Sequence, residues 1–122
     1  VALEIPIEVD VQVPKDLELS VYDMNIILTN LLDNSIEAVG GLKNKQINIE
    51  ISYSKSRLNI HISNPYDHVL KQENGRYVTT KEDSHEHGYG LKNIEKTVKK
   101  YDGTFEIQTA GNMFDVRVCV FL

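Results

Sequence analysis

Short segments in which every second residue is apolar constrain this chain most strongly. Residues 45–53 and 57–64 alternate in this way, and a short polar stretch separates them. Period-two alternation is typical of strands with one buried face, and a short polar connection between two of them predicts a hairpin. Residues 104–109 and 113–122 repeat the pattern around a turn at 110–112. The core is therefore expected to rest on antiparallel strand pairs.

The first residues of the chain also alternate. Residues 1–13 are predicted to form a strand with one buried face. Pro6 has no main-chain N–H to donate, so it favours a position at the edge of a sheet. The apolar residues on the face expected to be buried are Ile5, Ile7, Val9, Val11 and Val13.

Two further segments have the period of a helix. Residues 20–39 are predicted to form the first helix, with Ser20 or Asp23 as its N-cap. The second helix is expected to begin directly after Gly88-Tyr89-Gly90 and to end at Asp102-Gly103. The apolar residues at helical spacing are Met24, Ile27, Leu28, Leu31, Leu32, Ile36 and Val39 in the first helix, and Leu91, Ile94, Val98 and Tyr101 in the second.

The order of these elements predicts the fold class. Strand pairs mixed with two helices indicate an α+β fold, a two-layer sandwich with helices on one face of a mixed, mostly antiparallel sheet. All 122 residues fit one domain. Residues 65–87 show no periodicity, and a polar loop of that length inside a domain is usually functional.

Composition excludes several classes of function. With 13 basic and 18 acidic residues, the net charge of −5 argues against broad nucleic-acid binding. The single cysteine, Cys119, excludes an internal disulfide and is read as a structural, half-buried residue. No apolar run is long enough to cross a bilayer, and no leader sequence opens the chain. Because the chain opens with Val1 in strand-like sequence, it is expected to be a piece of a longer protein.

The polar side of the first helix is unusual. At about 100° per residue, Asn30, Asp33, Asn34 and Glu37 share one arc of the helix. Asparagine and aspartate are poor helix formers, so something other than helicity favours them here. Their oxygen atoms suit a hard cation such as Mg²⁺. The alternative is an ordinary solvated face.

Glycines and an inward asparagine supply two further candidates. Gly88 and Gly90, placed at the start of a helix with Lys92 close behind, suit a phosphate site, although no P-loop motif occurs. Asn64 follows the inward positions of its strand. It is either bonded to its own turn or an acceptor for the amino group of a ligand.

The four histidines do not form a convincing catalytic group. His61 is predicted to lie on the outer face of its strand. His68, His85 and His87 fall in the polar stretch 65–87, where solvated histidines are commoner than metal ligands. His87 lies next to Gly88 and is the one that we expect near phosphate.

Two motifs together resemble a known family. The stretch N-L-L-D-N-S-I-E-A at 30–38 resembles the N box of the GHKL ATPases, and H-G-Y-G-L-K-N-I at 87–94 resembles their G2 box. Thr79-Thr80-Lys81 is similar to the stretch that precedes this box in many histidine kinases. The resemblance covers essentially the whole chain and implies the Bergerat fold. Within the family, the chain looks most similar to the catalytic domains of Agr-like quorum-sensing kinases.

The resemblance implies roles for the first-helix residues. Asn34 matches the asparagine that holds Mg²⁺ between the phosphates of ATP. Asn30 matches the position of the catalytic glutamate in the hydrolysing members, and an amide there favours transfer to a protein over hydrolysis because it cannot act as a general base. Asp33 is expected near the metal or the adenine edge.

The resemblance also implies a nucleotide pocket and shows one departure from it. Asn64 stands where the family has an aspartate that accepts from the adenine amino group. Losing the charge of that acceptor predicts weak nucleotide affinity. The remaining residues implied to contact the nucleotide are Lys81, His87, Gly88, Tyr89, Gly90, Leu91 and Lys92.

As a whole, the resemblance implies the ATP-binding catalytic domain of a two-component sensor histidine kinase. The histidine acceptor would lie on a separate dimerisation domain, and a response regulator would act downstream. The domain would be cytoplasmic, in a membrane-anchored bacterial sensor, without touching membrane or nucleic acid itself. The fragment would bind Mg-ATP without phosphorylating itself. Two alternatives remain: a serine kinase of the anti-sigma type, and an interaction domain that has lost nucleotide binding.

Overall fold

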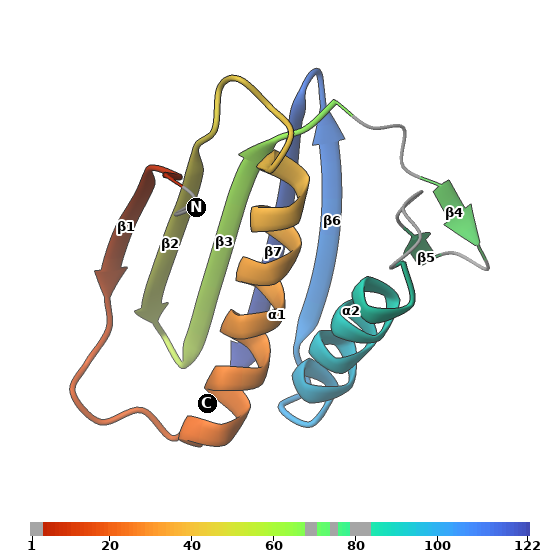
Figure 1. The fold of residues 1–122 in the computed structure, drawn as a ribbon. Coiled ribbons are helices and arrows are strands. Elements are labelled where there is room, and N and C mark those ends of the chain that lie inside the picture. The colour runs from red at the N-terminus through yellow and green to blue at the C-terminus, as the bar shows by residue number, and fades with distance from the viewer. Residues whose placement is uncertain (1–3, 68–70, 74–75, 79–83) are drawn as a thin grey trace.

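The computed structural model describes residues 4–67, 71–73, 76–78 and 84–122. The strands form a five-stranded sheet and a separate two-stranded ribbon. Figure 1 shows the helices in front of the large sheet. The elements in chain order are β1 (Ile7–Gln12), α1 (Val21–Val39), β2 (Ile47–Ser54), β3 (Arg57–Pro65), β4 (Lys71–Glu73), β5 (Arg76–Val78), α2 (Ser84–Lys99), β6 (Thr104–Ala110) and β7 (Met113–Phe121).

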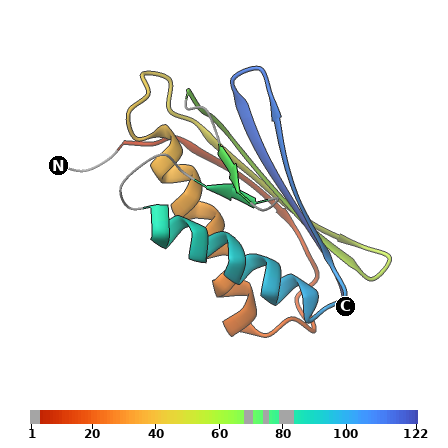
Figure 2. The same cartoon turned by 90° about the vertical axis from the view of Figure 1, so that its right-hand side faces the viewer.

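The large sheet has the order β1-β2-β3-β7-β6. Only β1 and β2 are parallel, and the other neighbours pair antiparallel. Both helices lie on the same face of this sheet, as the edge-on view in Figure 2 shows. The predicted α+β sandwich with a mostly antiparallel sheet is therefore confirmed. The connection from β1 through α1 to β2 is left-handed (Figure 1).

The two predicted hairpins form around residues that adopt positive φ. Lys55 and Ser56 have φ of 52° and 65° between β2 and β3. Two consecutive residues at positive φ give a type I′ turn, whose twist matches that of the flanking strands. Gly111, at φ 60°, serves the turn between β6 and β7.

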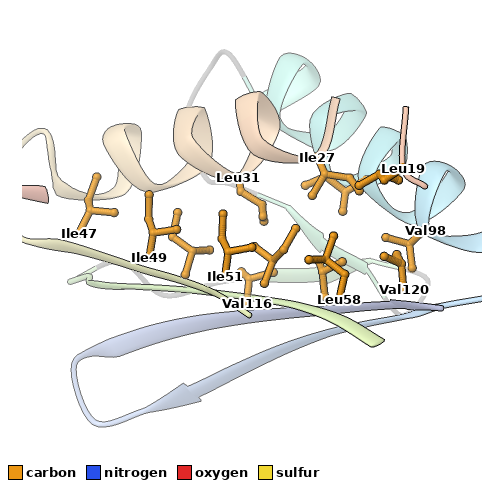
Figure 3. Close-up of a cluster of buried hydrophobic side chains, with 14 of the residues drawn as sticks. Leu19, Ile27, Leu31, Ile47, Ile49, Ile51, Leu58, Val98, Val116 and Val120 are labelled. Atoms are coloured by element: carbon orange, nitrogen blue, oxygen red, sulfur yellow. The ribbon is translucent and has the colours of Figure 1, made fainter. Parts of the chain in front are cut away.

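The hydrophobic core fills the space between the helices and the sheet (Figure 3). Alternate residues of each inner strand point into it, as the period-two pattern predicts. The apolar stripe of each helix faces the same layer. The least exposed core residues are Ile27, Leu31, Val39, Ile47, Leu58, Ile60, Ile62, Ile94, Val98, Val116, Val118 and Val120.

The first strand differs from its prediction. Ile7, Val9 and Val11 keep 44%, 60% and 50% of their surface exposed, so the expected buried face is wrong within β1. Their side chains lie on the helix side of the sheet, next to those of β2 in register. However, β1 is the edge strand, and neither helix extends over it (Figure 1). The edge position indicated by Pro6 is correct.

The stretch 65–87 also contains more regular structure than predicted. Within it, β4 and β5 pair as a small antiparallel ribbon, and α2 begins at Ser84 rather than after Gly90. Positions 68–70, 74–75 and 79–83, which include His68 and Lys81, lie outside the described residues. The role of the stretch 65–87 as a lid over a nucleotide stays a prediction. None of the helices that the structure describes is long and apolar enough to span a lipid bilayer.

The end of α2 depends on close packing. Asp102 takes the left-handed conformation at φ 52°, and the N–H of Gly103 donates to the carbonyl of Val98 at 3.0 Å. This is the Schellman arrangement that ends many helices. A Cβ on Gly103 would lie 2.2 Å from the carbonyl oxygen of Cys119. The predicted stop is confirmed, and glycine is required here because α2 meets β7 at this point.

A buried carboxylate joins the two helices. Ser20 caps α1 by accepting from the Asp23 N–H at 3.0 Å. The Asp23 carboxylate accepts from Lys100 Nζ, at 3.0 and 3.2 Å to its two oxygens, and from the Tyr101 hydroxyl. The Tyr101 hydroxyl and then Lys100 hold the pKa of Asp23 below its usual value of 3.8. The start of α1 is thereby fixed to the end of α2.

Replacing Asp23 with asparagine should lower the melting temperature at neutral pH. Because the pKa of Asp23 is lower in the folded state, its stabilising effect is present above pH 3.8 and is lost as the pH falls through the folded-state value. The difference between Asp23→Asn and the parent should therefore shrink below about pH 4. Thermal unfolding followed by circular dichroism from pH 7 to pH 2 measures it. Asp16→Asn, at an exposed carboxyl, is the control. A difference that stays constant down to pH 2 would contradict the assignment.

Candidate functional site

A cavity of about 300 Å³ lies between the two helices. This volume is at the lower end of the range for small-molecule sites. Residues from both recognised motifs line it, although more than 50 positions separate them in the chain. The lining residues are Asn30, Asp33, Asn34, Ile36, Glu37, Gly90 and Leu91.

Asn30 is held in place by its own helix. Its Nδ2 donates to the carbonyl of Ile26 at 2.8 Å, one turn earlier. Its Oδ1 faces α2, because a Cβ built on Gly90 would lie 3.0 Å from that oxygen. The absence of a side chain at Gly90 thus lets α2 approach Asn30 closely.

The charged residues that line this cavity are both acidic. Asp33 is exposed, and Glu37 and Asn34 are half-buried. Carboxylate and amide oxygens are the donors that Mg²⁺ prefers, so the residues present fit that ion chemically. Among the described residues, no group of three or more His, Cys, Asp or Glu is placed to hold a metal by itself.

The glycines of the second motif lie inside α2 rather than before it. Because α2 begins at Ser84, its free N–H groups belong to residues 84–87, and those of Gly88 and Gly90 fall within the hydrogen-bonded part of the helix. The prediction that these glycines precede the helix is therefore wrong.

The other predicted residues of this motif divide into two groups. Leu91 lines the cavity, and Lys92 is exposed one position further along α2. The side chains of His87 and Tyr89 lie outside what the structure describes, as does Lys81 as a whole. Their proposed contacts with a nucleotide stay predictions.

Asn64 is fully buried at the end of β3, as its alternation predicted. Its Oδ1 accepts from the Ser35 hydroxyl at 2.9 Å, and its Nδ2 donates to the carbonyl of Pro65 at 2.8 Å. The sequence left open whether Asn64 bonds to its own turn or to a ligand. The bond to Pro65 is the local contact of the first alternative. Ser35 was not predicted to be the partner of Asn64. The sequence does contain a signal for it, because a small polar residue on the apolar side of a helix needs a buried hydrogen-bond partner.

His61 lies on the sheet face opposite the helices, as predicted. It is half-buried rather than free at the surface, because its Nε2 lies 2.9 Å from Oδ1 of Asp115 on the neighbouring strand. Cys119 is half-buried on β7. Neither residue contributes to the cavity between the helices.

Comparisons with known proteins identify related folds. The catalytic domain of histidine kinase ThkA, in a nucleotide-free form, shares 19% sequence identity with a TM-score of 0.72, and the match covers 96% of this chain and 78% of that one. Histidine kinase AdeS of Acinetobacter baumannii shares 14% identity with a TM-score of 0.69, over 96% of this chain and 54% of that one.

A third structure, the histidine kinase domain of the blue-light activated kinase EL346 of Erythrobacter litoralis, shares 13% identity with a TM-score of 0.66. This match covers 95% of the present chain and 52% of the other. The chain thus spans about half the length of AdeS and of the EL346 structure. At these identities the likeness establishes a common fold.

Sequence comparison defines the family. No curated protein sequence matches the chain significantly. The family model described as GHKL domain matches residues 19–120, which include both motifs, β2, β3, β6 and all of β7 except its last residue. The assignment to the Agr-like group stays a prediction. The chain belongs to the GHKL domain family.

Proposed function

We propose that the chain is the Mg-ATP-binding catalytic domain of a two-component sensor histidine kinase. The observation that carries this proposal is the meeting of Asn30, Asn34 and Gly90 around one cavity. These residues come from the two motifs that resemble the nucleotide-binding boxes of the family. A nucleotide site requires these residues of two helices to lie around one cavity. An ordinary solvated helix face does not require it.

Asn30 supports phosphoryl transfer to a protein over hydrolysis. An amide has no basic group at neutral pH, and its Nδ2 is already committed to the carbonyl of Ile26. Asn30 therefore cannot remove a proton from water. A site that binds ATP without activating water retains the γ-phosphate for another acceptor.

Asn34 is the residue proposed to hold Mg²⁺, with Asp33 close to the ion. The ion would neutralise charge on the phosphates and fix their orientation. This requirement is strict here because Asp33 and Glu37 line the same cavity and repel an unaccompanied polyphosphate. ATP is accordingly expected to bind as its magnesium complex.

The acceptor and the downstream partner lie outside this chain. The γ-phosphate would pass to a histidine on a separate dimerisation domain, and from there to a response regulator. The intact protein is proposed to be a membrane-anchored bacterial sensor of the Agr-like group, with this domain in the cytoplasm. Alone, the domain should bind Mg-ATP and acquire no label from γ-labelled ATP.

Replacing Asn34 tests the site directly. Asn34→Ala should weaken ATP binding in the presence of Mg²⁺ by about tenfold or more, because it removes a charge-assisted interaction. Titration calorimetry with and without Mg²⁺ measures the effect. Asn25→Ala, at an exposed position on the same helix, is the matched control and should bind like the parent. Equal Mg²⁺-dependent binding by Asn34→Ala and the parent would overturn the metal role, and no binding by the parent would overturn the proposal.

Gly90→Ala tests the approach of the two helices. The new methyl group would lie 3.0 Å from Asn30 Oδ1 and must displace that side chain. Alanine also favours the helix by about 0.5–1 kcal/mol, so stability should change little while the affinity for Mg-ATP falls severalfold. Gly41→Ala is the control, since nothing lies within 4 Å of a Cβ there. Thermal unfolding and calorimetry on both variants separate the two effects, and undiminished binding by Gly90→Ala would contradict the prediction.

A further inference from the structure

A second hollow lies on the face of the sheet opposite the helices, across β1, β2 and β3. Its volume of about 440 Å³ is within the range of small-molecule sites. Both helices cover the other face of the sheet (Figure 2), so this hollow is separate from the candidate nucleotide site. The polar residues that line it are Glu8, Asp10, Asn48, Glu50, His61 and Ser63.

Three carboxylates line this hollow, and its lining contains no lysine or arginine among the residues that the structure describes. Asp10 on β1 lies directly opposite Glu50 on β2, and Glu8 precedes Asp10 by two residues on the same face. Like charges at opposite positions of neighbouring strands repel each other. A concave surface with charges of one sign also concentrates ions of the other sign. The hollow therefore favours a cation.

Ser63 supplies a buried polar group to the same hollow. Only 8% of its surface is exposed, and its hydroxyl makes no hydrogen bond with any described residue. A buried hydroxyl without a partner costs free energy and is uncommon in folded proteins. Because Ser63 lines the hollow, a ligand that binds there can provide the missing hydrogen bond.

His61 adds a further acceptor. Its Nε2 lies 2.9 Å from Oδ1 of Asp115. A carboxylate only accepts, so Nε2 carries the hydrogen, and the neutral ring leaves Nδ1 as an acceptor. An ammonium group has three hydrogens to donate and no lone pair, so it complements the hydroxyl oxygen, the ring nitrogen and the carboxylates of this hollow.

The spacing of the carboxylates favours an organic cation over a metal ion. Residues two apart on a strand are separated by about 7 Å, and neighbouring strands by about 4.8 Å. In the part of the chain that the structure describes, no three His, Cys, Asp or Glu converge to hold a metal. Carboxylates that are spread in this way match several ammonium groups joined by short aliphatic chains.

We propose that the hollow across β1, β2 and β3 binds an aliphatic polyamine. The ammonium groups of the ligand pair with Glu8, Asp10 and Glu50, and one of them donates to the Ser63 hydroxyl. Glu50 is central, because Asp10 and His61 lie opposite it on the two neighbouring strands. The inference does not rest on the proposed function, since no residue of this hollow lines the cavity between the helices.

Binding of spermidine to the whole chain tests the site. Titration calorimetry without nucleotide gives the dissociation constant, and spermidine should also raise the melting temperature. Ser63→Ala should weaken binding about tenfold, the range of a hydrogen bond to a charged group, without lowering the melting temperature of the free protein. Ser52→Ala, at an exposed serine on the same face of β2 and outside the hollow, is the matched control and should bind like the parent.

The charge of the hollow is tested separately. Glu50→Gln should weaken spermidine binding about three- to fivefold, as expected for an exposed ion pair. Glu106→Gln removes the same charge from an exposed position of β6 on the same face, outside the hollow, and should leave binding unchanged. Butylamine, which has a single ammonium group, should bind severalfold more weakly than spermidine.

Three results would overturn the inference. The first is a parent protein that does not bind spermidine. The second is binding that Ser63→Ala and Glu50→Gln leave unchanged, or that Glu106→Gln weakens as much as Glu50→Gln does, because this is only general attraction to a chain of net charge −5. The third is displacement of spermidine by an equal concentration of Mg²⁺. Binding of Mg-ATP is measured independently, so the nucleotide site stands or falls by its own variants.

Discussion

The candidate site depends on how closely α1 and α2 approach each other. Two contacts set this approach. Near the start of α1, Asp23 accepts from Lys100 and Tyr101 just beyond the end of α2. Further along, the bare backbone of Gly90 faces the amide oxygen of Asn30. One contact is electrostatic and the other is steric, and the cavity opens next to the second. The geometry of the candidate site therefore depends on how tightly the two helices pack.

Much of the fold could be predicted because it rests on periodicity. The strict alternation of β2, β3 and β7 placed Ile60, Val118 and the inward Asn64 correctly, since each inner strand has one face toward the helices. The exposure of Val9 could not be predicted in this way. Alternation reports that residues share a face, but whether anything covers that face depends on where the helices lie over the sheet.

The site could be predicted in part for the same reason. Asn30 and Asn34 are four residues apart, so they lie on the same face of the helix wherever that helix packs. Their proximity therefore follows from the sequence alone. Two features did not follow. Glycines often end helices, yet α2 continues through Gly88 and Gly90. At Gly90, close packing against Asn30 favours a residue without a side chain. The bond from Ser35 to Asn64 joins positions 29 apart and exists only once α1 lies on β3.

The left-handed connection between β1 and β2 has a consequence for the loops at either end of α1. Parallel strands joined through a helix are right-handed in about 98% of cases, because the natural twist of the strand favours that hand. A left-handed connection therefore needs more residues in its loops than a right-handed one. Residues 13–20 and 40–46, which carry out these turns, are longer than the connections of about two to six residues usual in such units. These two loops resemble surface segments that could be shortened without effect. Shortening either one would, however, strain the crossover and shift the helix that bears both asparagines.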